Sequence, residues 1–273
     1  MKLVGRKTEQ ALIETMLNSN HHVLLEGPVG VGKTTLALSV AEKLNRSLIR
    51  VDGDGRYTEQ KLVGSFDPKL VLERGFGRES FLPGPLYQAM EEGSILLINE
   101  LNRMPEMVQN VLLPALDERK IQIPIIGELK AQKGFSVIAT QNPREFVATS
   151  ALSEALLDRL EWISISPLSE KEELEVVKSS VQGTSLPFER IVALVRLTRG
   201  HAKIKRGASV RAAIAMAQAL SHSENTEENF WGIAKSVLAN RIELQSGKFS
   251  NRPYGDLLDE LMTELQTELK KKP

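Results

Sequence analysis

Short apolar runs alternate with amphipathic segments through the first part of the chain. The runs are short and continuous, which predicts buried strands. The segments between them carry apolar side chains at three- and four-residue spacing, which predicts helices. The strands are expected at residues 22–25, 48–51, 95–98, 135–139 and 162–165, and the helices at residues 8–17, 33–44 and 105–119.

This alternation indicates an α/β fold with a parallel five-stranded sheet that helices cover on both faces. Thr8 is expected to cap the first helix, and Pro105 is expected to be the first residue of the third. Residues 64–85 are rich in Gly and Pro and predict a loop or hairpin insertion. Residues 120–134 hold short apolar stretches broken by Pro and Gly, which predicts a hairpin.

The pattern changes after Pro167, where helical spacing continues without any strand candidate. This change predicts a domain boundary, with an α/β core at residues 1–166 and a smaller all-helical domain at residues 167–273. The helices of the second part are expected at residues 170–182, 188–199, 209–221, 227–240 and 256–271.

A glycine-rich loop of the form G-x-x-x-x-G-K-[ST] follows the first predicted strand and opens the next helix. Such a loop can aim several backbone N–H groups at the oxygens of a triphosphate. In this motif Lys33 would reach the β- and γ-phosphates, and the Thr34 hydroxyl would bind Mg²⁺. The residues expected to bind the nucleotide are Gly27, Pro28, Val29, Gly30, Val31, Gly32, Lys33, Thr34 and Thr35.

The strand at residues 95–98 delivers Asn99 and Glu100, where an Asp-Glu pair is expected beside a triphosphate. Glu100 can act as the base that polarises the attacking water. Asn99 can hold a metal-bound water together with Thr34, but it lacks the charge of Asp. Charged hydrogen bonds exceed neutral ones by ~1 kcal/mol, so Mg²⁺ binding should weaken about tenfold.

A second apolar run ends in Asp117 and Glu118 and imitates the missing Asp-Glu pair. Its apolar residues recur at three- and four-residue spacing, which predicts a helix rather than a strand. Asp117 is therefore interpreted as a solvated charge at a helix end, and Asn99 remains the departure.

Composition excludes several classes of function. Lys plus Arg and Asp plus Glu both number 35, so no net charge draws the chain toward nucleic acid or an anionic membrane. The chain has no cysteine, and its four His residues show no ligand spacing. With no apolar signal segment and no run of ~20 apolar residues, a soluble cytoplasmic protein without membrane contact is expected.

These motifs, taken in order, resemble those of the MoxR-type AAA+ ATPases. The resemblance implies a phosphate-loop AAA+ core followed by a helical lid. Asn99 in place of Asp, Leu160 in place of Phe and Val210 in place of Pro depart from the family pattern, and only the first affects chemistry. Beyond the phosphate loop, the similar segments are residues 84–86 (GPL), 101–105 (LNRMP), 108–113 (VQNVLL), 139–143 (ATQNP), 152–159 (LSEALLDR) and 207–212 (GASVRA).

The resemblance also implies roles for residues outside the phosphate loop. Asn142 would be the sensor-1 residue that orients the hydrolytic water. Arg159 would be an arginine finger that reaches the γ-phosphate in a neighbouring subunit, and Arg211 would be the sensor-2 contact from the lid. Together with Glu100 they form the expected catalytic set. Arg103 could contact a neighbouring subunit or brace the Glu100 loop.

The resemblance favours a homo-hexameric ring that uses ATP and Mg²⁺ to remodel or mature a client protein, with a von Willebrand factor A-domain protein as adaptor. One alternative is a nucleotide-gated binding module with negligible hydrolysis, which Asn99 supports. Another is a ring that acts on nucleic acid, which the neutral charge balance disfavours. Six basic residues could form a nucleic-acid patch, although a solvated loop is the simpler interpretation: Arg196, Arg199, His201, Lys203, Lys205 and Arg206.

Overall fold

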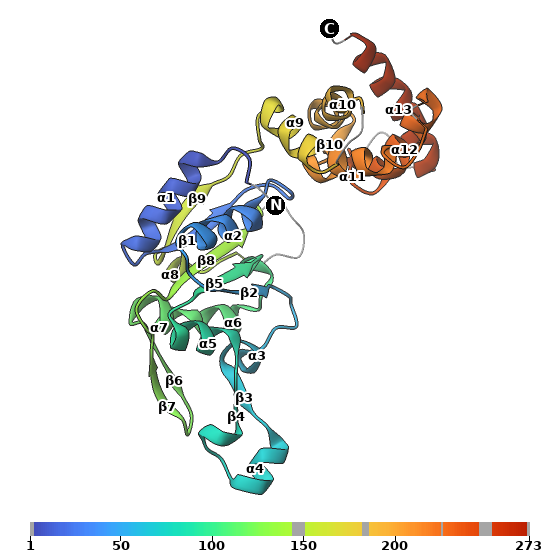
Figure 1. Cartoon of the computed structure of the whole chain (residues 1–273). Helices are drawn as coiled ribbons and strands as arrows, with labels where there is room; N and C mark the ends of the chain where they lie inside the picture. Colours follow the sequence, from blue (N-terminus) through green and yellow to red (C-terminus); the bar gives the residue numbers. More distant parts are fainter. Residues whose placement is uncertain (1–2, 144–150, 182–185, 225, 246–252, 272–273) are drawn as a thin grey trace. The chain divides into compact units, whose positions relative to one another are not determined.

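The computed structural model describes residues 3–143, 151–181, 186–224, 226–245 and 253–271. The chain divides into two compact units (Figure 1). The core unit comprises Met1–Pro28 and Gly32–Ser166, and the helical unit comprises Val29–Val31 and Pro167–Pro273. No described helix is long and apolar enough to cross a lipid bilayer.

A five-stranded parallel sheet forms the centre of the core unit, as the alternating pattern predicts. The strand order is β2-β5-β8-β1-β9, and all four neighbouring pairs are parallel. The middle strand β8 and its neighbour β5 are buried along their whole length, which explains their continuous apolar sequences. The strands are β1 (His22–Glu26), β2 (Leu48–Asp52), β5 (Ile95–Asn99), β8 (Ser136–Gln141) and β9 (Leu160–Ser164).

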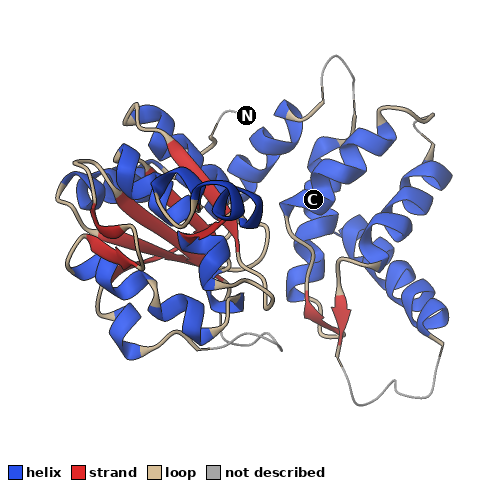
Figure 2. Cartoon of the chain, turned by 90° about the horizontal axis from the view of Figure 1, so that it is seen from below, coloured by secondary structure: helices blue, strands red, loops and turns tan. Residues whose placement is uncertain are grey.

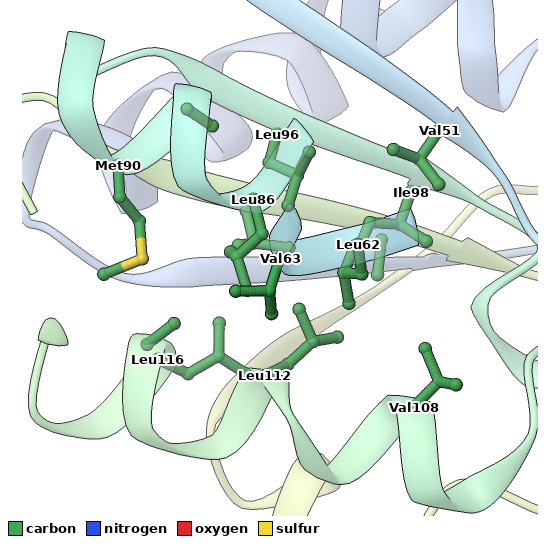
Figure 3. Packing of buried hydrophobic residues seen from close by; sticks show 14 of the residues in the cluster. Val51, Leu62, Val63, Leu86, Met90, Leu96, Ile98, Val108, Leu112 and Leu116 are labelled. Carbon is green, nitrogen blue, oxygen red and sulfur yellow. The ribbon is translucent and has the colours of Figure 1, made fainter. Parts of the chain in front are cut away.

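Helices cover the sheet of the core unit on both faces (Figure 2). One face carries α1 (Lys7–Asn18) and α2 (Lys33–Lys43), which contact each other and the central strands. The other face is packed by residues of α3 (Glu59–Val63), α5 (Pro85–Glu92) and the region of residues 106–117. Figure 3 shows Leu62, Leu86 and Leu112 from these helices meeting Leu96 and Ile98 of the sheet. This apolar layer fixes β5, which carries two candidate site residues at its end.

Two predicted helix starts were wrong. The first helix begins at Lys7, with Arg6 in the left-handed region before it, so Thr8 lies inside the first turn. The segment at residues 105–119 forms two helices, α6 (Glu106–Asn110) and α7 (Leu112–Asp117), and Pro105 precedes the first of them. Pro114 has no N–H to donate to the carbonyl of residue 110, so a single continuous helix cannot form there.

Two antiparallel hairpins extend from the core unit, and Figure 1 shows both leaving the sheet on the same side. The predicted hairpin at residues 120–134 contains β6 (Lys120–Ile123) and β7 (Gly127–Lys130). In the predicted insertion, β3 (Gly64–Phe66) pairs with β4 (Phe81–Pro83). This second hairpin carries α4 (Pro68–Arg74) and a 3-10 turn (Arg78–Ser80) between its strands. Leu72 on α4 is 89% exposed and Phe76 beside it is 62% exposed.

The helical unit differs from the expected all-helical domain by one short antiparallel strand pair, β10 (Ile204–Arg206) with β11 (Glu243–Leu244). The pairing joins segments far apart in the sequence, and three residues are too few to show strand periodicity. The helix expected at residues 170–182 ends at Ser179, and Gln182 lies outside the described residues. Its helices are α9 (Glu170–Ser179), α10 (Phe188–Gly200), α11 (Val210–Leu220), α12 (Glu227–Ala239) and α13 (Tyr254–Lys271), with a separate apolar core between them.

His22 should make the core unit sensitive to acid. Its ring is 4% exposed, and its Nδ1 accepts a hydrogen bond from the Val137 N–H at 2.9 Å. Burial, and next the charge of Arg119, lower the His22 pKa from 6.5 to about 4. Between these values the unfolded chain binds a proton that the folded chain excludes. The free energy of unfolding should therefore fall as the pH drops from 6.5 to 4, by about 3 kcal/mol in total.

Urea unfolding at pH 7 and pH 4.5 measures this effect. His22→Phe should flatten the decline between the two pH values relative to the native chain, even if its stability at pH 7 is lower. His21→Gln is the matched control, because His21 is an exposed neighbour with a side chain 52% accessible. Equal declines for the native chain and His22→Phe would contradict the assignment.

Candidate active site

The glycine-rich loop joins β1 to α2 at the carboxyl edge of the sheet. Gly27 lies so close to β9 that a Cβ atom there would be 2.2 Å from the Ile165 carbonyl oxygen. Gly32 precedes α2 with a φ of 95°, in the left-handed region that favours glycine. Pro28, Val29, Gly30 and Val31 complete the loop. The backbone therefore needs glycine at both ends of the loop, and the loop leads into a helix N-terminus as an anion site requires.

Lys33 is buried and directed back over this loop. Its Nζ donates to the carbonyl oxygens of Gly27 at 2.6 Å and Pro28 at 3.0 Å. The same Nζ donates to Oδ1 of Asn142 at 2.9 Å. The structure thus joins the loop lysine to the residue expected to act as sensor 1, although 109 positions separate them. Thr35 follows Thr34 in the first turn of α2.

Thr34 and Asn99 meet as expected for a metal-side pair. The Thr34 hydroxyl donates to Oδ1 of Asn99 at 2.9 Å. Asn99 also donates through Nδ2 to Oδ1 of Asp52 at 2.8 Å. Hydrogen bonds from Arg50, together with the one from Asn99, lower the Asp52 pKa below its ordinary value. A carboxylate therefore stands one hydrogen bond away from the metal-side amide.

Glu100 lies directly after β5 in the left-handed region, with φ 54° and ψ 49°. Its N–H donates to the Thr140 hydroxyl oxygen at 3.0 Å, which fixes this uncommon backbone conformation. Its carboxylate accepts from Asn142 Nδ2 at 3.3 Å and from Arg103 Nη1 at 2.6 Å. Of the two roles considered for Arg103, the structure shows that it braces Glu100 within the chain.

Arg159 lies between α8 (Glu154–Leu157) and β9, away from the hydrogen bonds of Lys33 and Glu100. Its guanidinium donates to Ala155 O at 2.8 Å and to Asp117 Oδ2 at 2.8 Å. Asp117 ends helix α7, as the helical spacing indicates, and is the ion-pair partner of Arg159. The candidate arginine finger is thus held in a defined position by its own chain.

Arg211 is an exposed residue in the first turn of α11 and belongs to the helical unit. Two hydrogen bonds join the segment before it to α10: Arg199 Nε donates to Ala208 O at 2.7 Å, and Ala208 N donates to Thr198 Oγ1 at 2.9 Å. Gly207 has no room for a side chain, because a Cβ there would lie 2.5 Å from the Arg199 Cα. The segment before α11 is therefore held against α10, and the role of Arg211 as sensor 2 stays a prediction.

The basic residues at positions 196–206 do not form an open cationic surface. Arg196 and Arg199 both bind the buried carboxylate of Glu173, at 3.1 Å and 2.6 Å. The others also lie beside carboxylates: Lys203 binds Glu260 and Glu264, Lys205 and Arg206 bind Glu243, and His201 is near Glu264 and Glu268. Because these charges are matched within the helical unit, the cluster gives little support for nucleic-acid binding.

Sequence reasoning missed Asp52 and Thr140, which both contact candidate site residues. Asp52 ends β2 just as Asn99 ends β5, and parallel strands bring such ends to one edge of a sheet. This position alone could have identified Asp52. Thr140 lies inside the fully buried β8, and its sequence gave no sign of a polar role.

The oxygen atoms of this edge fit Mg²⁺ bound together with a triphosphate. The hydroxyl of Thr34, the amide oxygen of Asn99 and the nearby carboxylates of Asp52 and Glu100 are hard oxygen groups, which Mg²⁺ prefers. No group of three or more His, Cys, Asp or Glu residues able to hold a metal occurs in the described part of the chain. These residues therefore fit an ion whose remaining ligands are phosphate oxygens and water molecules, rather than a metal held by protein side chains alone.

The stretch of sequence that carries these site residues matches a known family of protein domains. The model of the AAA domain, dynein-related subfamily, matches residues 22–160. The gas vesicle ATPase GvpN2 of Halobacterium salinarum is 28% identical over 96% of this chain and 79% of its own length. The gas vesicle ATPase GvpN of Haloferax mediterranei is 29% identical over 84% of this chain and 71% of its own length.

Solved structures share the fold at lower sequence identity. A candidate ATPase from Cytophaga hutchinsonii aligns with a TM-score of 0.54 and 23% identity, over 96% of this chain and 90% of that chain. The RuvB Holliday junction branch migration motor of Thermotoga maritima aligns with a TM-score of 0.52 and 18% identity, over 85% and 70% of the two chains. At these identities the likeness concerns the fold alone.

Proposed function

Because the chain belongs to the dynein-related subfamily of AAA domains, we propose that it binds ATP with Mg²⁺ and hydrolyses it. One observation carries the proposal: Asn142 bonds the loop lysine, Lys33, through Oδ1 and the candidate base, Glu100, through Nδ2. This arrangement holds a phosphate-binding group and a proton acceptor close together at one sheet edge. Hydrolysis of a bound triphosphate by water requires both groups at the same place.

The roles of the individual groups follow from their chemistry. Lys33 and the loop N–H groups would bind the phosphates, and Thr34 with Asn99 would hold Mg²⁺. When bound, Mg²⁺ neutralises negative charge that develops on the phosphates. Glu100 would accept the proton of the attacking water, and Asn142 would orient that water.

We infer a modest rate of hydrolysis, because the metal-side amide Asn99 carries no charge of its own. A client or adaptor that closes the site could raise this rate, which would couple hydrolysis to work on a partner. The second candidate, a nucleotide-gated module without turnover, rests on Asn99 as well. Native turnover no higher than that of the Lys33→Ala variant would favour the second candidate.

We also infer that Arg159 acts in a neighbouring subunit of a ring, for which a homo-hexamer is the expected form. Its guanidinium donates to Ala155 and Asp117, so among the described residues of its own chain it does not bond those of the phosphate site. A planar, permanently charged guanidinium suits the stabilisation of a transferring phosphoryl group. A ring would then hydrolyse ATP only between subunits.

Mixing inactive variants tests this arrangement. Arg159→Ala and Glu100→Gln chains should each turn over ATP at least about 10²-fold more slowly than the native chain. Their mixture should recover part of the native rate, because one interface in the mixed ring combines an intact Glu100 with an intact Arg159. The matched control mixes Glu100→Gln with Asn142→Ala, which cannot rebuild a complete site. Equal rates for both mixtures would contradict action across the subunit interface.

We propose that ATP hydrolysis by this chain drives a change in a client protein. The two hairpins of the core unit extend away from the sheet (Figure 1), and the segment between β3 and β4 exposes Leu72 and Phe76. Exposed apolar side chains on such arms suit transient protein contacts. The gas vesicle ATPases among the relatives favour a role in building or maturing a protein assembly, with a von Willebrand factor A-domain protein as a candidate adaptor.

A further inference from the structure

Asp52 occupies the position on β2 that corresponds to Asn99 on β5. The two residues are register partners in the parallel ladder, and each is the last residue of its strand. The link continues just beyond the strands, where the Gly53 N–H donates to Asn99 O at 2.7 Å. The two strand ends are therefore held together by backbone as well as by side chains.

Gly53 makes this close approach possible. A Cβ atom at Gly53 would lie 2.2 Å from the Glu100 carbonyl oxygen and 3.0 Å from the Asn99 carbonyl oxygen. Any larger residue would push β2 away from the residues that carry the metal-side amide and the candidate base. The Asp52-Gly53 turn is thus fitted to Asn99 and Glu100.

The charge of Asp52 decides how the amide of Asn99 is turned. The Thr34 hydroxyl can donate or accept, so it would tolerate either end of the amide. An ionised carboxylate can only accept, so it requires the Nδ2 group of Asn99. With Nδ2 bound to Asp52 at 2.8 Å, Oδ1 must face Thr34, which it does at 2.9 Å.

We propose that Asp52 replaces, from the neighbouring strand, the carboxylate that the chain lacks at position 99. Asp52 is a positioning residue that acts through Asn99: it turns the amide oxygen toward Thr34, where these two residues would hold Mg²⁺, and it brings negative charge to the site. The inference rests on the proposed use of ATP with Mg²⁺. An Asp at position 99 would supply both a metal-side oxygen and a negative charge. Here Asn99 on β5 supplies the oxygen, and Asp52 on β2 supplies the charge.

An ion pair with Arg50 is the competing explanation for Asp52. Arg50 donates to the same oxygen, Oδ1, through Nε at 3.2 Å and Nη2 at 2.9 Å, and both side chains are at least half exposed. An exposed pair of this kind contributes little to stability. None of the described residues donates to the second oxygen of Asp52, so that oxygen can accept a hydrogen bond from water near the cation. The ion pair alone does not explain the bond to Asn99.

Binding of a fluorescent non-hydrolysable ATP analogue to the full chain, with MgCl₂ or with EDTA, tests the inference. In the native chain MgCl₂ should tighten binding. In Asp52→Asn this gain should shrink about tenfold, with affinity in EDTA unchanged. Asp54→Asn is the matched control, since Asp54 lies in the same loop and its carboxylate accepts hydrogen bonds only from Arg56 among the described residues. The control should keep the native gain.

A charge exchange separates positioning from simple structural damage. Asn99→Asp alone should not increase the MgCl₂ gain, because a second carboxylate would face Asp52 across a contact of 2.8 Å. The double variant Asp52→Asn/Asn99→Asp restores one carboxylate and one amide, and it should recover the native gain. A merely structural role for Asp52 would not be rescued in this way.

Two failures can be told apart. A native chain that binds the analogue equally with MgCl₂ and with EDTA would overturn the proposed function. A native MgCl₂ gain that persists in Asp52→Asn, or that increases in Asn99→Asp while Asp52 is present, would overturn the role of Asp52 alone.

Discussion

Replacing Glu100 with Gln should lower ATP turnover about 10²–10⁴-fold, the range expected when a general base is removed. Gln has nearly the same shape, and its one amide oxygen can still accept from Arg103 or from Asn142, but it cannot take a proton from water. Binding of ATP should stay within about threefold of the native value, because one neutral group replaces a carboxylate that repels phosphate. Steady-state phosphate release and equilibrium binding measure the two effects.

Glu106→Gln provides the comparison for this variant. Glu106 is exposed in the first turn of α6, six positions further along the chain, and it is outside the hydrogen-bonded site. Its replacement should leave turnover unchanged. A Glu100→Gln variant that loses ATP binding, or that keeps more than about a tenth of the native turnover, would show that Glu100 is not the base.

Replacing Lys33 with Ala should weaken ATP binding about 10²-fold or more and remove turnover. The Nζ group is buried beside the loop and already makes three hydrogen bonds, to Gly27, Pro28 and Asn142. Hydrogen bonds from a charged donor to phosphate contribute ~1.5–3 kcal/mol each, so two lost bonds account for this change. Isothermal titration with ATP and MgCl₂ measures the affinity.

Lys43→Ala is the matched control, since Lys43 ends the same helix, has a side chain that is 56% exposed and pairs with Glu14. It should bind ATP as the native chain does. If Lys33→Ala retains native affinity while remaining folded, the loop is not the triphosphate site, and the proposed function falls with it.

The two large effects have a common structural origin. Lys33, Asn142 and Glu100 come from three separate segments, and they meet because β1, β8 and β5 are neighbours in the sheet. Each strand ends at the same edge, so residues just past the strands converge there. The apolar layer behind this edge, shown in Figure 3, holds the strand ends in register. The geometry of the site therefore depends on the packing of the core behind it.

Periodicity predicted the elements that are long and strongly patterned. The strands at residues 95–98 and 135–139 are buried on both faces, so their apolar runs are continuous and easily recognised. The break of the predicted helix at residues 105–119 was harder to predict, since the effect of Pro114 depends on which carbonyl its missing N–H would have met. The β10–β11 pair could not be predicted from the sequence, because strands of three and two residues are too short to show an alternating pattern.

The candidate site was predicted in part. The loop motif and the end of β5 identified Lys33, Thr34, Asn99 and Glu100 directly from the sequence. The resemblance added Asn142, and the structure shows that it contacts Lys33 and Glu100. The roles of Arg159 and Arg211 remain predictions, because they concern a neighbouring subunit and the helical unit.

The sequence by itself determined the α/β class, the glycine-rich loop and the substitution of Asn for Asp at position 99. These properties reside in local patterns and in residue identity. Only the tertiary structure decided that Asp52 bonds Asn99, that Arg103 braces Glu100 and that Asp117 holds Arg159. The bonds of Asp52 and Asp117 span more than 40 positions and depend on the order in which strands pair and on how the chain returns to the sheet edge. Because local periodicity does not encode strand order, what looked like a missing charge at Asn99 became, in the folded chain, a charge supplied by the neighbouring strand.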